Sequence, residues 1–269
     1  MQVYRDLRVL TARPTVEEEE AAPHRLYGHV DGAVNYSVGH YLGDLGRALD
    51  EADRARQIPI IVGGTGLYFK AMLEGLSDIP EVPAEVRERI RRESESLAAP
   101  ELHAALASKD PETARTLHPS DRLRILRALE VHAATGRPIL SFREERRPGL
   151  LTGVSVVRLF LSPDRDALRR RIDARFVAMI EQNALEEVAA LRDRHLDPML
   201  PVMRAHGVPG LVAYLNGEIS LDEAIAKGQA DTRRYAKRQF TWFRHQLPGW
   251  VWTSPEEGLD VALRSFSDL

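Results

Sequence analysis

The sequence predicts an α/β fold with a parallel sheet, a helical insertion subdomain and C-terminal helices. Residues 58–62, IPIIV, form an apolar and largely β-branched run, as in a strand buried on both faces of a parallel sheet. Residues 154–161 form a second such run, and capping residues and a helical pattern follow it directly. This strand-to-helix order is typical of α/β proteins. Between the two runs, residues 83–135 are charge-rich and helical in pattern, which indicates an insertion.

The elements of the first part are expected in the order helix, strand, glycine loop and helix. The pattern predicts a helix from Ser37 to Arg56, before the strand at 58–62. The loop GGTG follows, and the helix after it is expected to end at Gly75 in a left-handed conformation. The proline-containing segment 77–83 reads as a linker. These patterns divide the chain into residues 1–82, 83–150 and 151–269.

The later helices carry recognisable end signals. In the insertion, a helix is expected to begin at the N-cap Ser120 and to end at Gly136. After the strand at 154–161, Ser162 is the expected N-cap and Pro163 the first helical residue. From residue 186 onward helices are expected to dominate.

The composition excludes several classes of protein. The chain has 269 residues, 43% hydrophobic and 29% charged, which is typical of a globular protein with an ample core. A net charge of −3 excludes a globally basic nucleic-acid binder but not a local basic patch. No cysteine is present, so disulfides, thiol nucleophiles and cysteine-rich zinc sites are excluded. No run of about 18 apolar residues and no signal-peptide pattern occurs, so we expect no membrane association and a cytoplasmic protein.

The loop Gly63, Gly64, Thr65, Gly66 is a candidate diphosphate site. A glycine-rich turn before a helix exposes backbone N–H groups beside the positive end of the helix dipole, where a phosphate can bind. Thr65 adds a hydroxyl donor. The loop is not a Walker loop, since it lacks the lysine and hydroxyl that follow the last glycine there. A purely structural tight turn explains the glycines equally well.

Residues 232–246 predict a helix with a basic and an aromatic side. At 100° per residue, five cations fall within an arc of about 140°: Arg233, Arg234, Lys237, Arg238 and Arg244. Such a side suits a phosphate backbone, although an ordinary solvated helix surface shows the same pattern.

Other arginines are open to two interpretations. Arg124 and Arg127 share a helix side and suit a phosphate clamp, while Glu130 three residues on suits an ion pair with Arg127. Arg175 follows the expected strand at 154–161, where a guanidinium near the sheet's carboxyl end can bind diphosphate. The nine histidines show no metal-binding spacing, and no serine–histidine–aspartate arrangement is recognisable.

Six segments, in order, resemble the tRNA dimethylallyltransferase family, also called tRNA isopentenyltransferases. They are MQVYRDL, IPIIVGGTGLYFKAML, DPETARTLHPSDRLRILRALEVHAATGRP, ARFVAMIEQNALEEV, MRAHGVPGL and YAKRQFTWFR. The resemblance covers almost the whole chain. It implies a P-loop-NTPase-like parallel sheet core and transfer of a dimethylallyl group from dimethylallyl diphosphate to N6 of the adenosine 3′ of the tRNA anticodon. It also implies Mg²⁺ as cofactor, a tRNA anticodon stem-loop as partner, and a monomer.

The resemblance also implies roles for individual residues. Thr65 and Arg175 match catalytic positions at the diphosphate, with Gly63, Gly64 and Gly66 in the same loop. The positions matching tRNA contacts are Met1, Gln2, Arg124, Arg127, Arg204, Lys237, Arg238, Gln239, Thr241 and Arg244.

The chain departs from the family at its beginning. The family's G-P-T-A-S-G-K-[ST] motif and its general-base aspartate, two residues before the position of Met1, are not found. We therefore expect a core N-terminally truncated at an internal methionine, with impaired activity. Asn183 replaces a usual glycine, and Gly210 a usually polar residue. Two alternatives stay open: a catalytically inactive RNA-binding remnant, and a small-molecule P-loop kinase relative.

Overall fold

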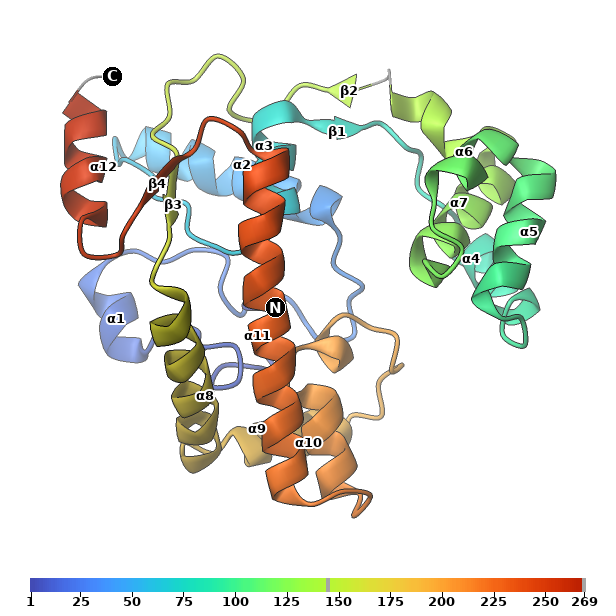
Figure 1. Ribbon diagram of the computed structural model, residues 1–269. Coiled ribbons are helices and arrows are strands. Elements are labelled where there is room, and N and C mark those ends of the chain that lie inside the picture. Colours follow the sequence, from blue (N-terminus) through green and yellow to red (C-terminus); the bar gives the residue numbers. More distant parts are fainter. Residues whose placement is uncertain (144–145, 268–269) are drawn as a thin grey trace. The chain divides into compact units, whose positions relative to one another are not determined.

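The computed structural model describes residues 1–143 and 146–267, which form two compact units (Figure 1). The first unit comprises residues 1–72 and 153–269, and the second residues 73–152. The sequence places the start of the insertion at residue 83. The second unit starts earlier because a short strand pair joins its two ends: β1 (Leu76–Ser77) pairs antiparallel with β2 (Arg146–Arg147).

Helices make up most of the first unit. Its helices are α1 (Val16–Ala21), α2 (Val38–Arg54), α3 (Gly66–Glu74, which runs into the second unit), α8 (Arg165–Glu181), α9 (Ala184–Arg192), the 3-10 helix η2 (Val202–Arg204), α10 (Val208–Leu215), α11 (Leu221–Gln246) and α12 (Gly258–Ser267). The long α11 packs against both α8 and α10 (Figure 1).

The sheet of the first unit is smaller than the sequence predicts. Strand β3 (Leu159–Leu161) pairs in parallel with β4 (Val251–Thr253), and a single parallel bridge joins Tyr4 to Val30. The strand predicted at 154–161 therefore covers only its last three residues. The strand predicted at 58–62 is wrong for this structure: in the described part of the chain no backbone hydrogen bond involves residues 58–64. A β-branched run becomes a strand only where a neighbouring strand pairs with it.

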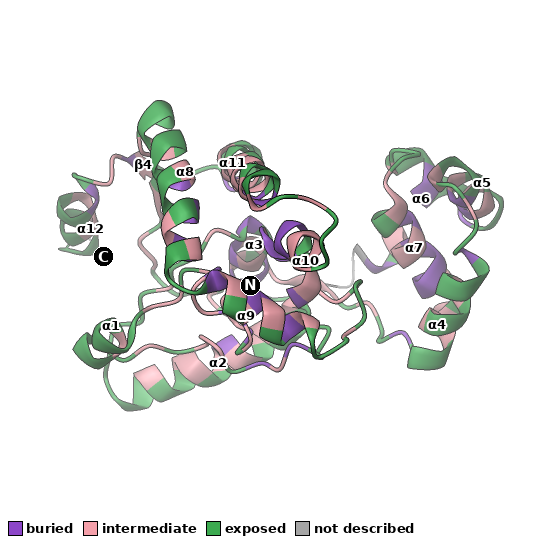
Figure 2. Ribbon diagram, turned by 90° about the horizontal axis from the view of Figure 1, so that it is seen from below, coloured by how far each residue is buried: buried purple, intermediate pink, exposed green. Residues whose placement is uncertain are grey.

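The hydrophobic core of the first unit joins the N-terminal segment to α8, α9, α10 and α11. Leu7, Val188 and Leu211 have no exposed surface, and Tyr4 belongs to the same buried cluster. Figure 2 shows the buried part of α10, which contributes to this core, in purple. The N-terminal segment is thus fixed by helices that lie about 180 residues later in the chain.

Helix ends follow the expected residue types but not always the expected positions. Ser37 caps α2, and Gly75 and Gly136 adopt the predicted left-handed conformation. Helix α7, however, is capped by Asp121 rather than Ser120, and α8 by Asp164 rather than Ser162. In both cases a carboxylate nearer the first turn accepts the free N–H groups, so it displaces the weaker hydroxyl cap.

The second unit is a helical bundle with its own core. Its elements are α4 (Ala84–Glu93), α5 (Ala99–Lys109), α6 (Pro111–Thr116), α7 (Arg122–Thr135) and the 3-10 helix η1 (Ile139–Arg143). Leu102, Leu106 and Ile125 are fully or almost fully buried between these helices. This agrees with the predicted helical insertion. None of the described helices is both long and apolar enough to cross a lipid bilayer.

Candidate functional site

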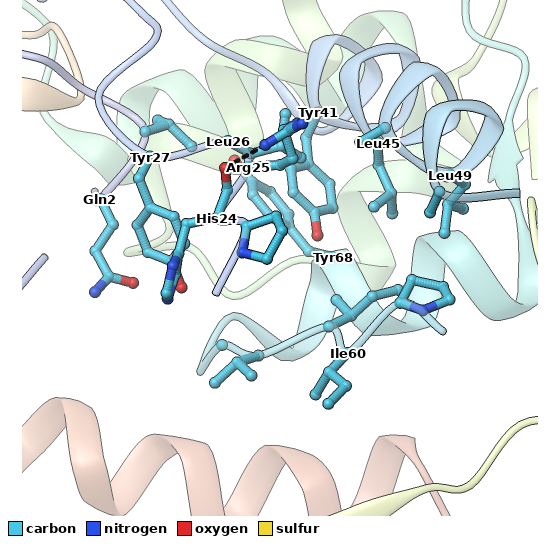
Figure 3. A pocket seen from close by; sticks show the side chains of 18 of the residues that line it. Gln2, His24, Arg25, Leu26, Tyr27, Tyr41, Leu45, Leu49, Ile60 and Tyr68 are labelled. Carbon is cyan, nitrogen blue, oxygen red and sulfur yellow. Dashed lines mark hydrogen bonds between the residues drawn. The ribbon is translucent and has the colours of Figure 1, made fainter. Parts of the chain in front are cut away.

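A cavity of about 740 Å³ opens beside the glycine loop in the first unit (Figure 3). Gly63, Gly64 and Thr65 line it together with Met1 and Gln2. The structure therefore brings the predicted diphosphate loop and the two N-terminal residues of the candidate site to one cavity.

Two tyrosines form a wall of this cavity. The rings of Tyr41 in α2 and Tyr68 in α3 stack with centroids 4.1 Å apart, across the cavity from Ile60 (Figure 3). Burial, followed by the neighbouring tyrosine, raises the pKa of Tyr41 to about 12. Burial also raises the pKa of Tyr68 to about 12. Both phenols are neutral near pH 7, so the wall is aromatic and uncharged. The sequence analysis missed both residues, although Tyr68 lies only three residues after Thr65.

Two glycines of the loop allow α11 to approach closely. A Cβ on Gly66 would lie 2.2 Å from Trp242 Cε3, and a Cβ on Gly64 would lie 1.7 Å from Gln239 Nε2. At Gly66 the Trp242 ring leaves no room for a side chain, whereas at Gly64 the end of the flexible Gln239 side chain would have to move. Close packing therefore explains these glycines, as the structural interpretation holds. The same packing puts Gln239 directly against the candidate diphosphate loop.

The loop also keeps free hydrogen-bonding capacity. Thr65 precedes α3, and its carbonyl accepts from Tyr68 N at 2.9 Å. The N–H groups of a helix's first turn have no partner within the helix and are the natural donors to an anion. The exposed Thr65 hydroxyl stands beside them. The arrangement can bind an oxyanion at the cavity mouth.

Hydrogen bonds hold Gln2, which also lines the cavity, in place. The side-chain Nε2 of Gln2 donates to the Ala12 carbonyl at 2.9 Å. The backbone carbonyl of Gln2 accepts from Gly28 N at 2.9 Å. Burial lowers the pKa of the Met1 amino group. The side chain of Gln2 thus has a defined orientation, with its amide oxygen free of any hydrogen bond to described residues.

The predicted two-sided character of α11 is confirmed. Phe243 is buried, whereas Lys237, Arg238, Thr241 and Arg244 are exposed. Arg238 lies over the Tyr235 ring, 5.8 Å from its centroid, and Arg244 over the Trp252 ring at 5.3 Å. Aromatic rings support both guanidinium groups without neutralising them.

Two of the five cations expected on this side are neutralised by acids. Arg233 pairs with Asp173 of α8, and Arg234 with Asp231 one turn earlier in α11. Helical periodicity correctly predicted that the cations lie on one side of the helix. It could not predict that Asp173 of the neighbouring helix α8 pairs with Arg233. The available basic surface of α11 is therefore Lys237, Arg238 and Arg244.

Arg175 and Arg204 are exposed on other elements of the same unit. Arg175 lies in α8, where partial burial and the neighbouring Arg171 lower the pKa of its guanidinium. No ion pair to an acid in residues 1–143 or 146–267 neutralises it, which leaves it available to an anionic ligand. Arg204 ends η2, near the start of α10.

Arg124 and Arg127 lie on α7 in the second unit. Arg127 approaches Glu130 at 3.9 Å, and Arg124 approaches Asp121 at 3.5 Å. Glu130 is buried and also contacts Arg91 at 3.4 Å. The ion-pair interpretation of Arg127 is thus confirmed, while the largely exposed Arg124 keeps the better geometry for an external phosphate.

His206 is a further residue that the sequence analysis did not single out. Its ring lies 4.9 Å from that of Tyr235, between centroids. Burial, followed by the positive charge of Arg238, lowers the pKa of His206. It is therefore neutral at pH 7, and it packs behind the basic side of α11.

The described residues contain no group of three or more histidine, aspartate or glutamate side chains able to hold a metal ion. The polar groups of the loop at residues 63–66 are backbone N–H and carbonyl groups and the Thr65 hydroxyl, and none of them is a carboxylate. This donor set favours an anion and does not fit a resident Mg²⁺, which prefers several oxygen ligands including carboxylates.

The comparisons with known proteins agree with this fold. The IPP transferase family model matches residues 2–246. The tRNA dimethylallyltransferase of Methylobacterium nodulans is 67% identical over 258 residues, 96% of this chain and 85% of the relative. One from Methylorubrum extorquens is 65% identical and is covered over 81% of its length. The expectation that the chain lacks the family's P-loop segment is not confirmed by these matches, and neither alternative gains support from them.

Solved structures show the same architecture. A eukaryotic dimethylallyltransferase acting on tRNA superposes with a TM-score of 0.77 at 25% identity, covering 99% of this chain and 69% of that one. The tRNA isopentenylpyrophosphate transferase of Staphylococcus epidermidis gives 0.67 at 28% identity, covering 100% and 88%. By its sequence match and its fold, the chain belongs to the IPP transferase family.

Proposed function

We propose that this protein transfers a dimethylallyl group from dimethylallyl diphosphate to N6 of the adenosine next to the anticodon, on its 3′ side, in tRNA. One observation supports this above the others: α11 packs against the glycine loop with Trp242 and Gln239 and exposes Lys237, Arg238 and Arg244 to solvent. The same helix, α11, therefore contacts the candidate anion-binding loop and carries a basic surface that suits a phosphate backbone.

The reaction needs an environment that stabilises a leaving diphosphate. The allylic C–O bond breaks and its electrons stay on the diphosphate, while N6 of adenine forms the new C–N bond and passes its proton to the departing diphosphate or to water. In this proposal the N–H groups of the glycine loop and the Thr65 hydroxyl donate to the diphosphate, with the Arg175 guanidinium as a second donor. The uncharged tyrosine wall limits water near the allylic carbon.

The RNA is held by cations outside the cavity. Met1 and Gln2 face the target adenine, and phosphates or bases of the stem-loop are contacted by Arg124, Arg127, Arg204, Lys237, Arg238, Gln239, Thr241 and Arg244. A base that reacts at N6 must leave the stack, and an uncharged cavity beside a basic surface suits an extruded adenine. We expect the protein to act as a cytoplasmic monomer. We assign no Mg²⁺ ligands among the residues that the structure describes, because those of the glycine loop do not fit such a site.

The direct test is transfer of labelled dimethylallyl from its diphosphate to an anticodon stem-loop by this chain. We expect product on stem-loops with adenosine at the target position and none where inosine replaces it, since inosine lacks the N6 amino group. Binding of RNA without transfer would instead support the RNA-binding alternative. The absence of both RNA binding and dimethylallyl transfer would contradict the proposal.

Two substitutions separate the proposed roles. Arg175→Ala is expected to lower the transfer rate by about a hundredfold with little change in RNA affinity, as for the loss of one donor to a developing oxyanion. Arg238→Ala is expected to weaken RNA binding by about tenfold and to reduce the salt slope by about one. Filter binding and single-turnover rates measure both.

A charge-matched control is Arg264→Ala on α12, which removes one exposed cation outside the site. It should leave both quantities nearly unchanged. If Arg175→Ala and Arg238→Ala had the same effects as each other, the division of roles between diphosphate and RNA would be wrong.

A further inference from the structure

The carboxylate of Glu187 in α9 accepts hydrogen bonds from three consecutive backbone N–H groups of the N-terminal segment. Its Oε1 accepts from the N–H groups of Arg8 and Val9, the latter at 3.0 Å, and its Oε2 accepts from Leu10 N at 2.9 Å. Consecutive N–H groups that converge in this way form a concave anion site. Here the anion is a carboxylate of the same chain, half-buried beside the fully buried Val188.

The turn that Glu187 holds continues directly to the acceptor of Gln2. Ala12 N donates to the Val9 carbonyl at 2.9 Å, and Ala12 adopts a left-handed conformation with φ of 49°. This conformation is unfavourable for alanine and persists only where its surroundings impose it. The Ala12 carbonyl then accepts from Gln2 Nε2 at 2.9 Å. A continuous series of hydrogen bonds thus leads from Glu187 through residues 8–12 to the side chain of Gln2.

Other contacts also hold this turn and its neighbours: Thr11 Oγ1 donates to the Leu7 carbonyl at 2.9 Å, and Arg13 N donates to the Arg8 carbonyl at 3.0 Å. Asp6 pairs with Arg194, and its Oδ2 accepts from Gly32 N at 2.8 Å. The buried side chains of Leu7 and Leu10 hold the segment against α9 and α10. None of these contacts provides an acceptor for the N–H groups of residues 8–10, so among the described residues the Glu187 carboxylate alone fixes the direction of these three groups.

We propose that Glu187 is a positioning residue that orients the Gln2 amide toward the target base. This inference rests on the proposed function. Because Gln2 Nε2 is engaged with Ala12, its amide oxygen is the group left to recognise the base, and it suits a donor such as the adenine N6 amino group. Glu187 itself lies in α9 and does not line the cavity.

The test compares binding of two stem-loops, one with adenosine at the target position and one with an abasic site there. Glu187→Gln keeps the side-chain shape but replaces one acceptor oxygen by a donor that cannot serve the three N–H groups. We expect the affinity ratio of the two stem-loops to fall by about fivefold, the size expected for one hydrogen bond. The salt slope, which reports phosphate contacts, should not change.

Two further variants make the test specific. Glu186→Gln changes the adjacent, exposed glutamate of the same helix turn and should leave the affinity ratio unchanged. In a Gln2→Ala background, Glu187→Gln should have no additional effect on the ratio, because both substitutions remove the same base contact. Glu187→Asp keeps the charge and withdraws it by one methylene, and should lower the ratio by a smaller factor.

An unchanged ratio in either soluble Glu187 variant would overturn the inference, as would a full additional loss in the Gln2→Ala background. A wild-type chain that bound both stem-loops equally would overturn the inference and the base contact of the proposed function together. A normal wild-type ratio that Glu187→Gln leaves intact would overturn the inference alone.

Discussion

His206 illustrates how a single half-buried base links stability to pH. Its folded-state pKa lies below the ordinary value of 6.5, first because of burial and then because of Arg238. Asp231 acts in the opposite direction, and the N-terminal amino group and Arg234 add to the lowering. As the pH falls through about 6.5, the unfolded chain binds a proton before the folded chain does. The contribution of His206 to the free energy of unfolding is therefore fully present above this pH and decreases below it.

The expected outcome is a difference between wild type and His206→Gln in acid. Between about pH 7.5 and about pH 5.5, the free energy of unfolding should fall more for wild type than for His206→Gln, which has no proton to take up. Urea unfolding at the two pH values measures this. His245→Gln, at an exposed position of α11, is the control and should behave as wild type. Equal losses in wild type and His206→Gln would contradict the expectation.

Arginine pairing shows the limit of prediction at the residue scale. Glu130 lies one helical turn after Arg127, so their contact followed from spacing alone. The partner of Arg233 is Asp173 in α8, 60 residues away, and no local pattern indicates it. The same holds for Glu187 and residues 8–10. The pair of Arg127 and Glu130 could thus be interpreted from the sequence, and that of Arg234 and Asp231 has the same spacing, whereas the partners of Arg233 and Glu187 could not be.

At the scale of elements, the packing of α11 on α8 depends on one glycine. A Cβ on Gly228 would lie 2.1 Å from Phe176 Cζ, and the Phe176 ring is only 4% exposed. The contact is supported by Gln229 Nε2, which donates to the Asp173 carbonyl at 3.0 Å. A buried ring has little room to move, so a larger residue at 228 must separate the helices.

Gly228→Ala is therefore expected to destabilise the protein. Overpacking costs about 1–3 kcal/mol, more than the gain of up to about 1 kcal/mol from the higher helix propensity of alanine. Chemical denaturation measures the net loss. Gly43→Ala in α2 is the matched control: its nearest neighbour is Arg47 Nη1 at 4.0 Å, so it should stabilise by about 0.5–1 kcal/mol. A Gly228→Ala protein as stable as wild type would show that the helices adjust freely.

Helix ends were predicted to within two residues. Serine, aspartate and glycine at helix ends act through contacts within a few residues, so their role is readable from the sequence. Where Ser120 stands beside Asp121, however, the choice between them depended on the backbone geometry of the first turn.

At the scale of the whole molecule, an apolar surface stands out on the first unit. Ile58, Ile60 and Val62 are exposed, Ile60 to 84%. On α12, Leu259, Leu263 and Phe266 are also exposed, at the spacing of one helix side. Exposed apolar side chains on a segment without backbone hydrogen bonds favour association between chains.

Ile60→Ser is expected to reduce this association without lowering stability, because the Ile60 side chain loses little contact on substitution. Light scattering at increasing protein concentration, together with a denaturation curve, measures both effects. Val16→Ser, at an isolated site that is 53% exposed, is the control and should leave scattering unchanged. Equal scattering by wild type and Ile60→Ser would show that residues 58–62 do not mediate association.

The sequence by itself determined the features whose physics is local. Helical periodicity placed the cations of α11 on one side, end signals located most helices, and the order of six motifs indicated the family that the whole-chain comparison then showed. Tertiary structure alone decided whether residues 58–62 pair as a strand, that Asp173 of α8 neutralises Arg233, and that Glu187 reaches the turn at residues 8–12. These outcomes depend on partners far apart in the sequence, and an amino-acid pattern contains no record of which distant groups will meet.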